Sequence, residues 1–248
     1  MARYQVILAY DGTGFTGSQR QANSRTVQGE LERALRKLGW ADRVVLMAGR
    51  TDAGVHATGQ VAAFDLDWTH TAAKLLWALN TELPPDLVVR DLFPVAADFH
   101  PRFDATAREY RYRVYFEPIR DPFRQKYLWR TWPAVDEDAL VKNASIFLGT
   151  HDFAAFGSRT TPKGTTVRTV KKSEWKRMPD GEWQFEVRAD AFLYRMVRRL
   201  VFVQVAVAQK RSSLEKIQHA LSKQGTLLAG LAPAHGLTLV EVTYGSRE

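Results

Sequence analysis

The chain has 248 residues, 45% of them hydrophobic, which is enough to bury the core of one large domain or two moderate ones. Its 35 Lys and Arg residues outnumber its 27 Asp and Glu residues, so we expect a positive surface that attracts a polyanion, with nucleic acid the first candidate. The absence of cysteine excludes disulfides, Cys-ligated zinc, iron-sulfur clusters and thiol nucleophiles.

The first half of the chain alternates strand-like and helix-like patterns. Strands are expected at 4–10, 43–48, 60–64 and 87–93, and helices at 26–38 and 71–80. In the first helix Val27, Leu31 and Leu35 recur at helical spacing, and Gly39 provides a C-terminal stop. This order of elements suits a sheet that is covered by helices on one face.

The second half repeats the same kinds of element. Residues 108–116 alternate aromatic or aliphatic side chains with largely basic ones, which predicts a strand. Further strands are expected at 165–176, 182–189 and 236–244, and helices at 136–148, 192–210 and from Ser212 to about Lys223. Ser212 and Glu215 form a capping-box pattern at the start of the last helix. We therefore expect an α+β protein with two similar subdomains, residues 1–105 and 106–248, each a mainly antiparallel sheet with helices on one face.

No signal-like apolar segment follows Met1, and no run of about 18 apolar residues is present. We therefore expect a soluble, cytoplasmic protein without a membrane partner. The histidines are scattered without metal-ligand spacing, so we expect no metal site.

Glycines 12, 14 and 17 follow the first strand with the spacing of a dinucleotide-binding loop, which would make the chain a nucleotide-dependent oxidoreductase. The segment 18–24 that follows is polar and has no helical pattern, so no helix N-terminus is expected beside the glycines to hold a pyrophosphate. A flexible loop on the substrate side is the better interpretation.

Asp52 lies in a loop flanked by Gly49 and Gly54, where little side-chain bulk would block an approaching ligand. By local chemistry alone, an ordinary Asx turn is the more common explanation of such a residue. Arg50 and Thr51 favour a functional role, because a cation and a hydroxyl beside the carboxylate keep it ionised or orient it. We assign His56 to hydrogen bonding at the surface and give it no role in catalysis.

The segment 108–130 interleaves basic and aromatic residues, an arrangement in which cations follow phosphates while rings stack on unpaired bases. A solvated charged face of an amphipathic strand is the alternative. A second basic cluster includes Lys171 and Lys172, and a third lies on the long helix at Arg195, Arg198 and Arg199, where the pattern alone suggests solvated arginines. The residues that we expect to contact RNA are Arg20, Arg108, Arg111, Arg124, Lys171 and Lys172.

Taken in order, these segments resemble the TruA family of tRNA pseudouridine synthases over nearly the whole chain. Residues 49–60, which read Gly-Arg-Thr-Asp-Ala-Gly-Val-His-Ala-Thr-Gly-Gln, match the catalytic motif of the family. Further matches with the same order and spacing lie at 10–12, 19–21, 99–103, 107–112, 192–193, 196–198, 232–234 and 236–237. Three positions depart from the family, which usually has Trp at Ser18, Asn at Arg199 and Gly at Phe202.

The resemblance implies an isomerase that converts uridine to pseudouridine at nucleotide positions 38, 39 and 40 of the tRNA anticodon stem-loop, without metal or cofactor. It implies that Asp52 is the nucleophile, that Tyr110 contacts the target uridine, and that Arg198 pairs with Asp52. It also implies a homodimer, and two α+β halves joined into a pseudo-symmetric sheet around a basic central cleft.

The reaction breaks the C1′–N1 bond, turns the base and joins C5 to C1′, so a carboxylate suffices and no redox cofactor is needed. Asp52 attacks C1′, attacks C6, or stabilises charge as the bond breaks, and the sequence does not choose among these routes. Because the target lies in a helical stem, we expect the nucleotide to be flipped out, with Tyr110 stacking on or near it. A non-catalytic RNA-binding protein or RNA chaperone is the alternative that the basic segments alone would support.

Overall fold

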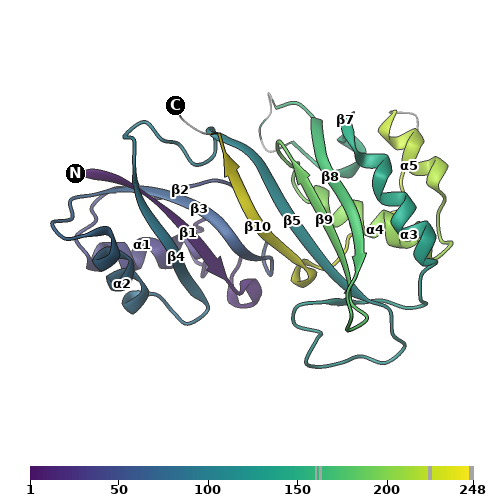
Figure 1. Ribbon diagram of the computed structural model, residues 1–248, viewed down its shortest axis with the longest axis horizontal. Coiled ribbons are helices and arrows are strands. Elements are labelled where there is room, and N and C mark those ends of the chain that lie inside the picture. Colours follow the sequence, from purple (N-terminus) through teal and green to yellow (C-terminus); the bar gives the residue numbers. More distant parts are fainter. Residues whose placement is uncertain (160, 162–163, 223–224, 246–248) are drawn as a thin grey trace. The chain divides into compact units, whose positions relative to one another are not determined.

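The computed structural model describes residues 1–159, 161, 164–222 and 225–245. The chain divides into two compact units (Figure 1). Unit 1 comprises Met1–Thr106 together with the C-terminal strand from Thr238, and unit 2 comprises Ala107–Leu237. Both units contain strands and helices, and the described strands belong to one ten-stranded sheet, which confirms the predicted α+β class.

The sheet of unit 1 is built around β1 (Ala2–Tyr10) and β3 (His56–Leu66), which are antiparallel neighbours. On the other side of β1 lies antiparallel β4 (Leu87–Val95). The short β2 (Leu46–Met47) pairs with β3, and β10 (Leu237–Tyr244) runs parallel to β3 at its start. The sheet is therefore mainly antiparallel, as predicted.

Helices α1 (Val27–Lys37) and α2 (Ala72–Glu82) lie together beside this sheet (Figure 1). Each begins at a threonine whose hydroxyl accepts a hydrogen bond from the first turn: Thr26 from the Gly29 N–H, and Thr71 from the Lys74 N–H. Alternate residues of β1 are fully buried while those between them are only partly covered, so the helices cover one face of the sheet.

The sheet of unit 2 has the order β5 (Ala105–Tyr115), β9 (Trp183–Ala189), β8 (Val167–Arg177) and β7 (Gly149–Asp152), with antiparallel pairing throughout this row. The two-residue β6 (Trp129–Arg130) runs parallel to the end of β5. Residues 110, 112 and 114 of β5 are on one face and 109, 111 and 113 on the other, as the alternating sequence predicts.

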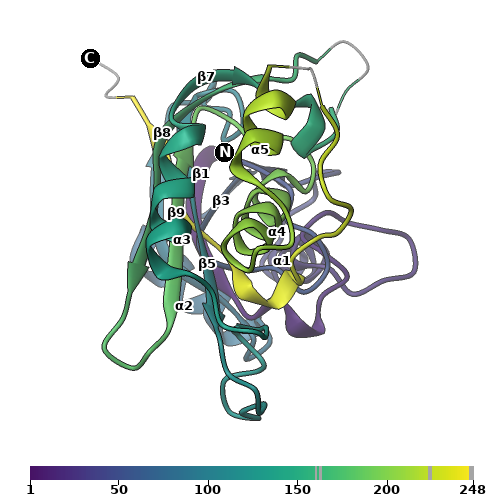
Figure 2. The same ribbon diagram turned by 90° about the vertical axis from the view of Figure 1, so that its right-hand side faces the viewer.

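Helices α3 (Glu137–Ala144), α4 (Met196–Ala208) and α5 (Leu214–Leu221) accompany this sheet (Figure 2). Two hydrogen bonds identify the covered face of β8: the Ser173 hydroxyl donates to the Ala144 carbonyl of α3, and the Trp175 indole donates to the Gln204 amide oxygen of α4. The opposite face of β8 carries Lys172, Glu174 and Lys176.

Several predicted boundaries differ from the observed ones. Of the expected strand 43–48 only Leu46 and Met47 form a strand, β2, and β3 begins at His56 rather than near residue 60. The long helix begins at Met196 rather than near residue 192, because Arg195 adopts a left-handed conformation with φ of 64°. The last helix begins at Leu214, with Ser213 rather than Ser212 at the N-cap position and no capping hydrogen bond from its side chain, and its expected end at Lys223 lies outside the described residues.

The position of the last strand also differs from the prediction. A division at residue 105 assigned this strand to the second subdomain, whereas Thr238 and Leu239 pair with His56 and Ala57 in unit 1. Strand pairing between segments so far apart in the sequence leaves no local signal, which is why element order alone misplaced it.

Candidate active site

Asp52 lies in unit 1 on the loop that connects β2 to β3. The loop turns directly after this residue: the Val55 N–H donates to the Asp52 carbonyl at 3.1 Å, and Gly54 has φ of 77°, a conformation that favours glycine. Asp52 is partly buried and Arg50 is exposed on the same loop. The predicted carboxylate and its neighbouring cation therefore share one short, tightly turned segment.

Gly12 and Gly17 pack against this loop. A Cβ on Gly12 would lie 2.1 Å from the Val55 carbonyl oxygen, and one on Gly17 would lie 2.9 Å from that of Thr51. Gly17 also has φ of 93°. No helix follows the glycines directly, since α1 begins only at Val27. These glycines allow two backbone segments to approach each other, which accounts for them without a bound dinucleotide.

Thr51 anchors the loop to β1 and to the glycine segment. Its hydroxyl lies 2.9 Å from the Tyr10 hydroxyl, its N–H donates to the Ser18 hydroxyl at 2.8 Å, and its carbonyl accepts from the Ser18 N–H at 3.1 Å. Burial raises the pKa of Tyr10 to about 12, although hydrogen bonds with Thr51 and Gln60 oppose the shift. Tyr10 is therefore neutral throughout the working pH range. The sequence does not reveal this network, because Ser18 is notable there only as a departure from the family.

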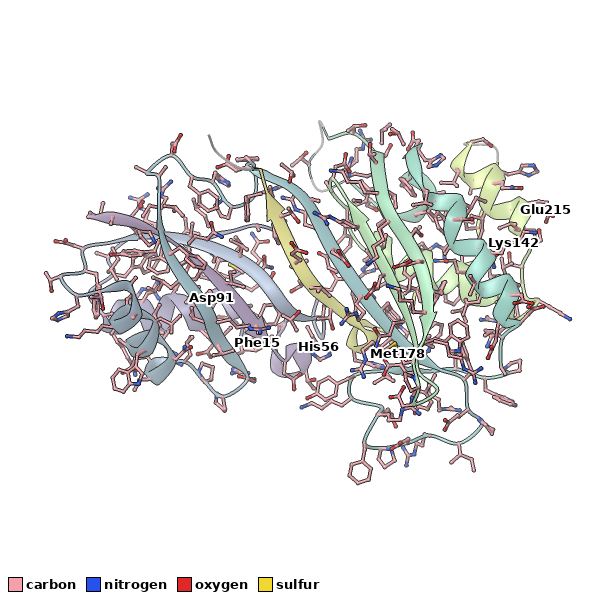
Figure 3. All side chains as sticks on the ribbon, in the orientation of Figure 1. Phe15, His56, Asp91, Lys142, Met178 and Glu215 are labelled. Atoms are coloured by element: carbon pink, nitrogen blue, oxygen red, sulfur yellow. The ribbon has the colours of Figure 1, made fainter. Side chains whose placement is uncertain are left out.

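His56 is buried, which corrects its predicted place at the surface. Its Nδ1 accepts a hydrogen bond from the Gly12 N–H at 3.0 Å and lies 3.3 Å from the Asp11 carboxylate. His56 begins β3 and Phe15 follows the glycine turn, and both lie at the same end of the unit 1 sheet (Figure 3). The histidine therefore fastens the glycine segment to the sheet.

Tyr110 lies in unit 2, in the middle of β5, and is partly buried. Its ring meets the Phe192 ring edge-on, with centroids 5.0 Å apart. Arg108, on the same face of the strand, donates to the Asp190 carbonyl at 2.9 Å. Both residues thus lie on the face opposite to Arg111.

Arg198 lies in the first turn of α4, and it is tied to the segment before β10. Its Nε donates to the Ala232 carbonyl at 2.8 Å, and the Ala232 N–H donates to the Arg198 carbonyl at 3.3 Å. One edge of the guanidinium is therefore held by backbone, which corrects the pattern-based expectation of a solvated arginine.

The two departures on α4 contact this same segment. Arg199 donates to the Gly230 carbonyl at 2.5 Å, and burial lowers its pKa. The Phe202 ring lies where a Gly230 side chain would be, since a Cβ there would come within 2.0 Å of the ring. Arg199 and Phe202 thus form a local pair around Gly230.

The predicted basic face of β5 and β8 is balanced by acids. Glu186 of β9, which is only 8% exposed, accepts hydrogen bonds from Arg111 at 2.9 Å, Lys172 at 2.7 Å and Lys176 at 3.0 Å. Arg113 binds the buried Glu182 through both carboxylate oxygens at 2.6 Å. A phosphate must therefore compete with Glu186 for two of the predicted RNA-binding residues, Arg111 and Lys172.

This acidic centre predicts an acid-sensitive stability. Burial alone would raise the pKa of Glu186, but hydrogen bonds from Lys172, Lys176 and Arg111 lower it to about 2. A carboxylate with a depressed pKa stabilises the fold fully above its ordinary pKa of 4.5, and this contribution is lost as the pH falls towards 2. We expect Glu186 to contribute about 2 kcal/mol to the free energy of unfolding at neutral pH. Urea unfolding between pH 6 and pH 3 measures this contribution.

The matched variants for this measurement are Glu186→Gln and Glu137→Gln, the latter in an exposed pair with Arg177. Glu186→Gln should lower the free energy of unfolding at pH 6 and flatten its fall below pH 4.5, whereas Glu137→Gln should change neither. An unchanged pH dependence in Glu186→Gln would contradict the prediction.

The remaining predicted RNA contacts have different surroundings. Arg20 binds the fully buried Glu32 at 2.6 Å, and the Arg124 guanidinium lies over the Tyr115 ring, 4.6 Å from its centroid. Lys171 is exposed at an irregularity in β8. Arg20 and Arg124 therefore have structural partners that a phosphate would have to replace.

Within the described ranges, no cluster of three or more His, Asp or Glu side chains has the arrangement of a metal site. Among the described helices, none combines the length and apolar character needed to cross a membrane.

Comparison with known proteins decides the family. A family model described as tRNA pseudouridine synthase matches residues 6–104 and 144–245. The chain is 41% identical over 251 residues to tRNA pseudouridine synthase A of Chloroflexus aurantiacus, covering 98% of this chain and 89% of the relative. The chain belongs to the TruA family of tRNA pseudouridine synthases.

Other TruA relatives agree. The enzyme of Shouchella clausii is 41% identical, with 99% of this chain and 94% of the relative covered, and that of Brevibacillus brevis is 40% identical, with 98% and 100% covered. A chain of a solved Cbf5-Nop10-Gar1 complex aligns with a TM-score of 0.35 and 11% identity, covering 95% of this chain and 48% of that one, which is too weak to support a conclusion. Membership in TruA confirms the predicted class of enzyme, an isomerase that makes pseudouridine in tRNA.

Proposed function

We propose that this chain converts uridine to pseudouridine at positions 38, 39 and 40 of the tRNA anticodon stem-loop, with Asp52 as the nucleophile. The observation that carries the proposal is the Asp52 loop, in which the family's catalytic motif is held by backbone packing against Gly12 and Gly17. Such packing pre-organises a reacting group without placing side chains in the path of the substrate.

The reaction comprises three changes in the substrate. The C1′–N1 bond breaks, the base turns, and C5 joins C1′ while C5 loses its proton and N1 takes one up. Asp52 attacks C1′ or C6, or stabilises the charge that develops on the ribose. Because a stem encloses these atoms, the target nucleotide is flipped out of the helix first.

Tyr110 and Arg198 complete the proposed set. We assign Tyr110 to contact with the flipped uridine; its partly buried ring, packed edge-on against Phe192, supports a fixed orientation. We assign Arg198 to pairing with the Asp52 carboxylate, and its backbone-held Nε supports a fixed direction. Arg50 is exposed beside Asp52, and its positive charge stabilises the negative charge of the substrate or of the carboxylate.

For tRNA binding, exposure supports Lys171 among the predicted contacts. Arg20, Arg108, Arg111, Arg124 and Lys172 stay in the proposed set as residues that already bind protein groups and would have to exchange them for phosphate. We further propose that the enzyme acts in the cytoplasm as a homodimer, which light scattering tests directly.

The function is tested with tRNA labelled with tritium at uridine C5. The purified protein, without added metal or cofactor, should release tritium from a transcript that has uridine at positions 38, 39 or 40 and none from a transcript with cytidine at all three. Binding without release would identify a non-catalytic RNA-binding protein. Saturable nicotinamide binding without affinity for tRNA would identify the oxidoreductase.

A further inference from the structure

Ser18 makes two hydrogen bonds with the backbone of Thr51, the residue before Asp52. Its side chain is 1% exposed, its hydroxyl accepts the Thr51 N–H at 2.8 Å, and its own N–H donates to the Thr51 carbonyl at 3.1 Å. A single residue therefore satisfies both backbone polar groups of Thr51, and one of these two bonds depends on the side chain at position 18.

The other contacts of Thr51 do not replace the hydrogen bond from its N–H to the Ser18 hydroxyl. Tyr10 holds the Thr51 side chain at 2.9 Å, and Gly17 abuts the carbonyl side, where a Cβ would come within 2.9 Å of the oxygen. The N–H side of Thr51 faces the Ser18 hydroxyl. Arg50 and Gly49 precede it in a stretch without regular secondary structure, so the hydroxyl restrains the loop on its N-terminal side.

We infer that Ser18 is a positioning residue for catalysis: its hydroxyl fixes the Thr51 peptide and thereby the direction of the Asp52 carboxylate. The inference rests on the proposed role of Asp52. Without the acceptor, the buried N–H has to find another partner, and the easiest adjustment is a rotation of the Arg50–Thr51 peptide, which displaces the backbone that continues into Asp52. A displacement of about 1 Å at a reacting group lowers rates by about a hundredfold.

The sharpest test compares Ser18→Thr with Ser18→Val, because the two side chains have nearly the same shape and only threonine keeps the hydroxyl. We expect the single-turnover rate of tritium release at saturating tRNA to be at least about tenfold faster for Ser18→Thr than for Ser18→Val. The dissociation constant for tRNA should agree within about twofold between them, since the loop is displaced rather than the RNA surface.

Ser18→Ala provides the second comparison, matched with Ser173→Ala in unit 2. Ser173 is also buried and its hydroxyl bonds the Ala144 carbonyl at 2.7 Å, so its loss should lower the Tm to a similar extent. We expect Ser18→Ala to lose about tenfold to a hundredfold in single-turnover rate and Ser173→Ala to keep the rate of the unmodified enzyme.

Two results would overturn the inference. Equal rates for Ser18→Thr and Ser18→Val would show that the hydroxyl has no part in positioning, and this pair remains informative at low temperature if Ser18→Ala unfolds. A loss of tRNA affinity with an unchanged rate at saturation would make Ser18 an RNA contact instead. Failure of the proposed function is distinguishable, because the unmodified enzyme would then release no tritium.

Discussion

Asp52→Asn should reduce the single-turnover release of tritium from C5-labelled tRNA by at least about 10⁴-fold, because the amide has nearly the shape of the carboxylate but neither its charge nor its nucleophilicity. The fold should survive the change. The loop is held through the backbone of Thr51 and the close packing of Gly12 and Gly17, and these contacts are the same in the variant.

Asp91→Asn is the matched control, because Asp91 is exposed on β4 of the same unit (Figure 3). It should keep the rate, the Tm and the tRNA affinity of the unmodified enzyme. Asp52→Asn should keep the Tm and bind tRNA with a dissociation constant within about tenfold of the unmodified value. Release at more than about one hundredth of the normal rate would exclude Asp52 as the nucleophile.

Arg198→Lys should lower the single-turnover rate by about a hundredfold to a thousandfold, nearly as much as Arg198→Met. In arginine, Nε binds the Ala232 carbonyl while the planar guanidinium carries further donors in a fixed fork. Lysine has a single nitrogen on a flexible stem, so it cannot hold the backbone and direct a second donor towards a carboxylate with the same geometry.

The control for Arg198 is Arg177→Lys, which alters an exposed arginine paired with Glu137 and should leave catalysis unchanged. The rate is measured at saturating tRNA so that weakened binding does not enter it. If Arg198→Lys retained a third or more of the rate, positive charge alone would be sufficient, and the proposed directional role of the guanidinium would be wrong.

Local patterns predicted the elements whose cause is local. Thr26 and Gly39 delimit the first helix because a cap and a stop act within one turn, and the alternation in 108–116 gives a strand with its rings and charges on opposite faces. The start of α5 shows the limit of such reasoning, because Ser212 and Ser213 are adjacent and the backbone places Ser213 at the N-cap position without a capping hydrogen bond from its side chain.

The site was less predictable, because its contacts join distant segments. The roles of Gly12 and Gly17 depend on residues 51–55, and His56 is buried because the glycine segment folds over it. The pairing of Arg111 with Glu186 depends on the register between β5 and β9, which periodicity does not determine. The carboxylate itself was found through the family motif rather than through local chemistry.

The balanced face of unit 2 changes how the net charge of +8 should be understood. A cation releases a condensed counterion from RNA only when it meets a phosphate, and Arg111, Arg113, Lys172 and Lys176 already neutralise carboxylates within the protein. The salt dependence of tRNA binding should therefore reflect far fewer ionic contacts than the number of basic residues suggests. The number of basic residues in this enzyme therefore overstates the electrostatic contribution to RNA binding.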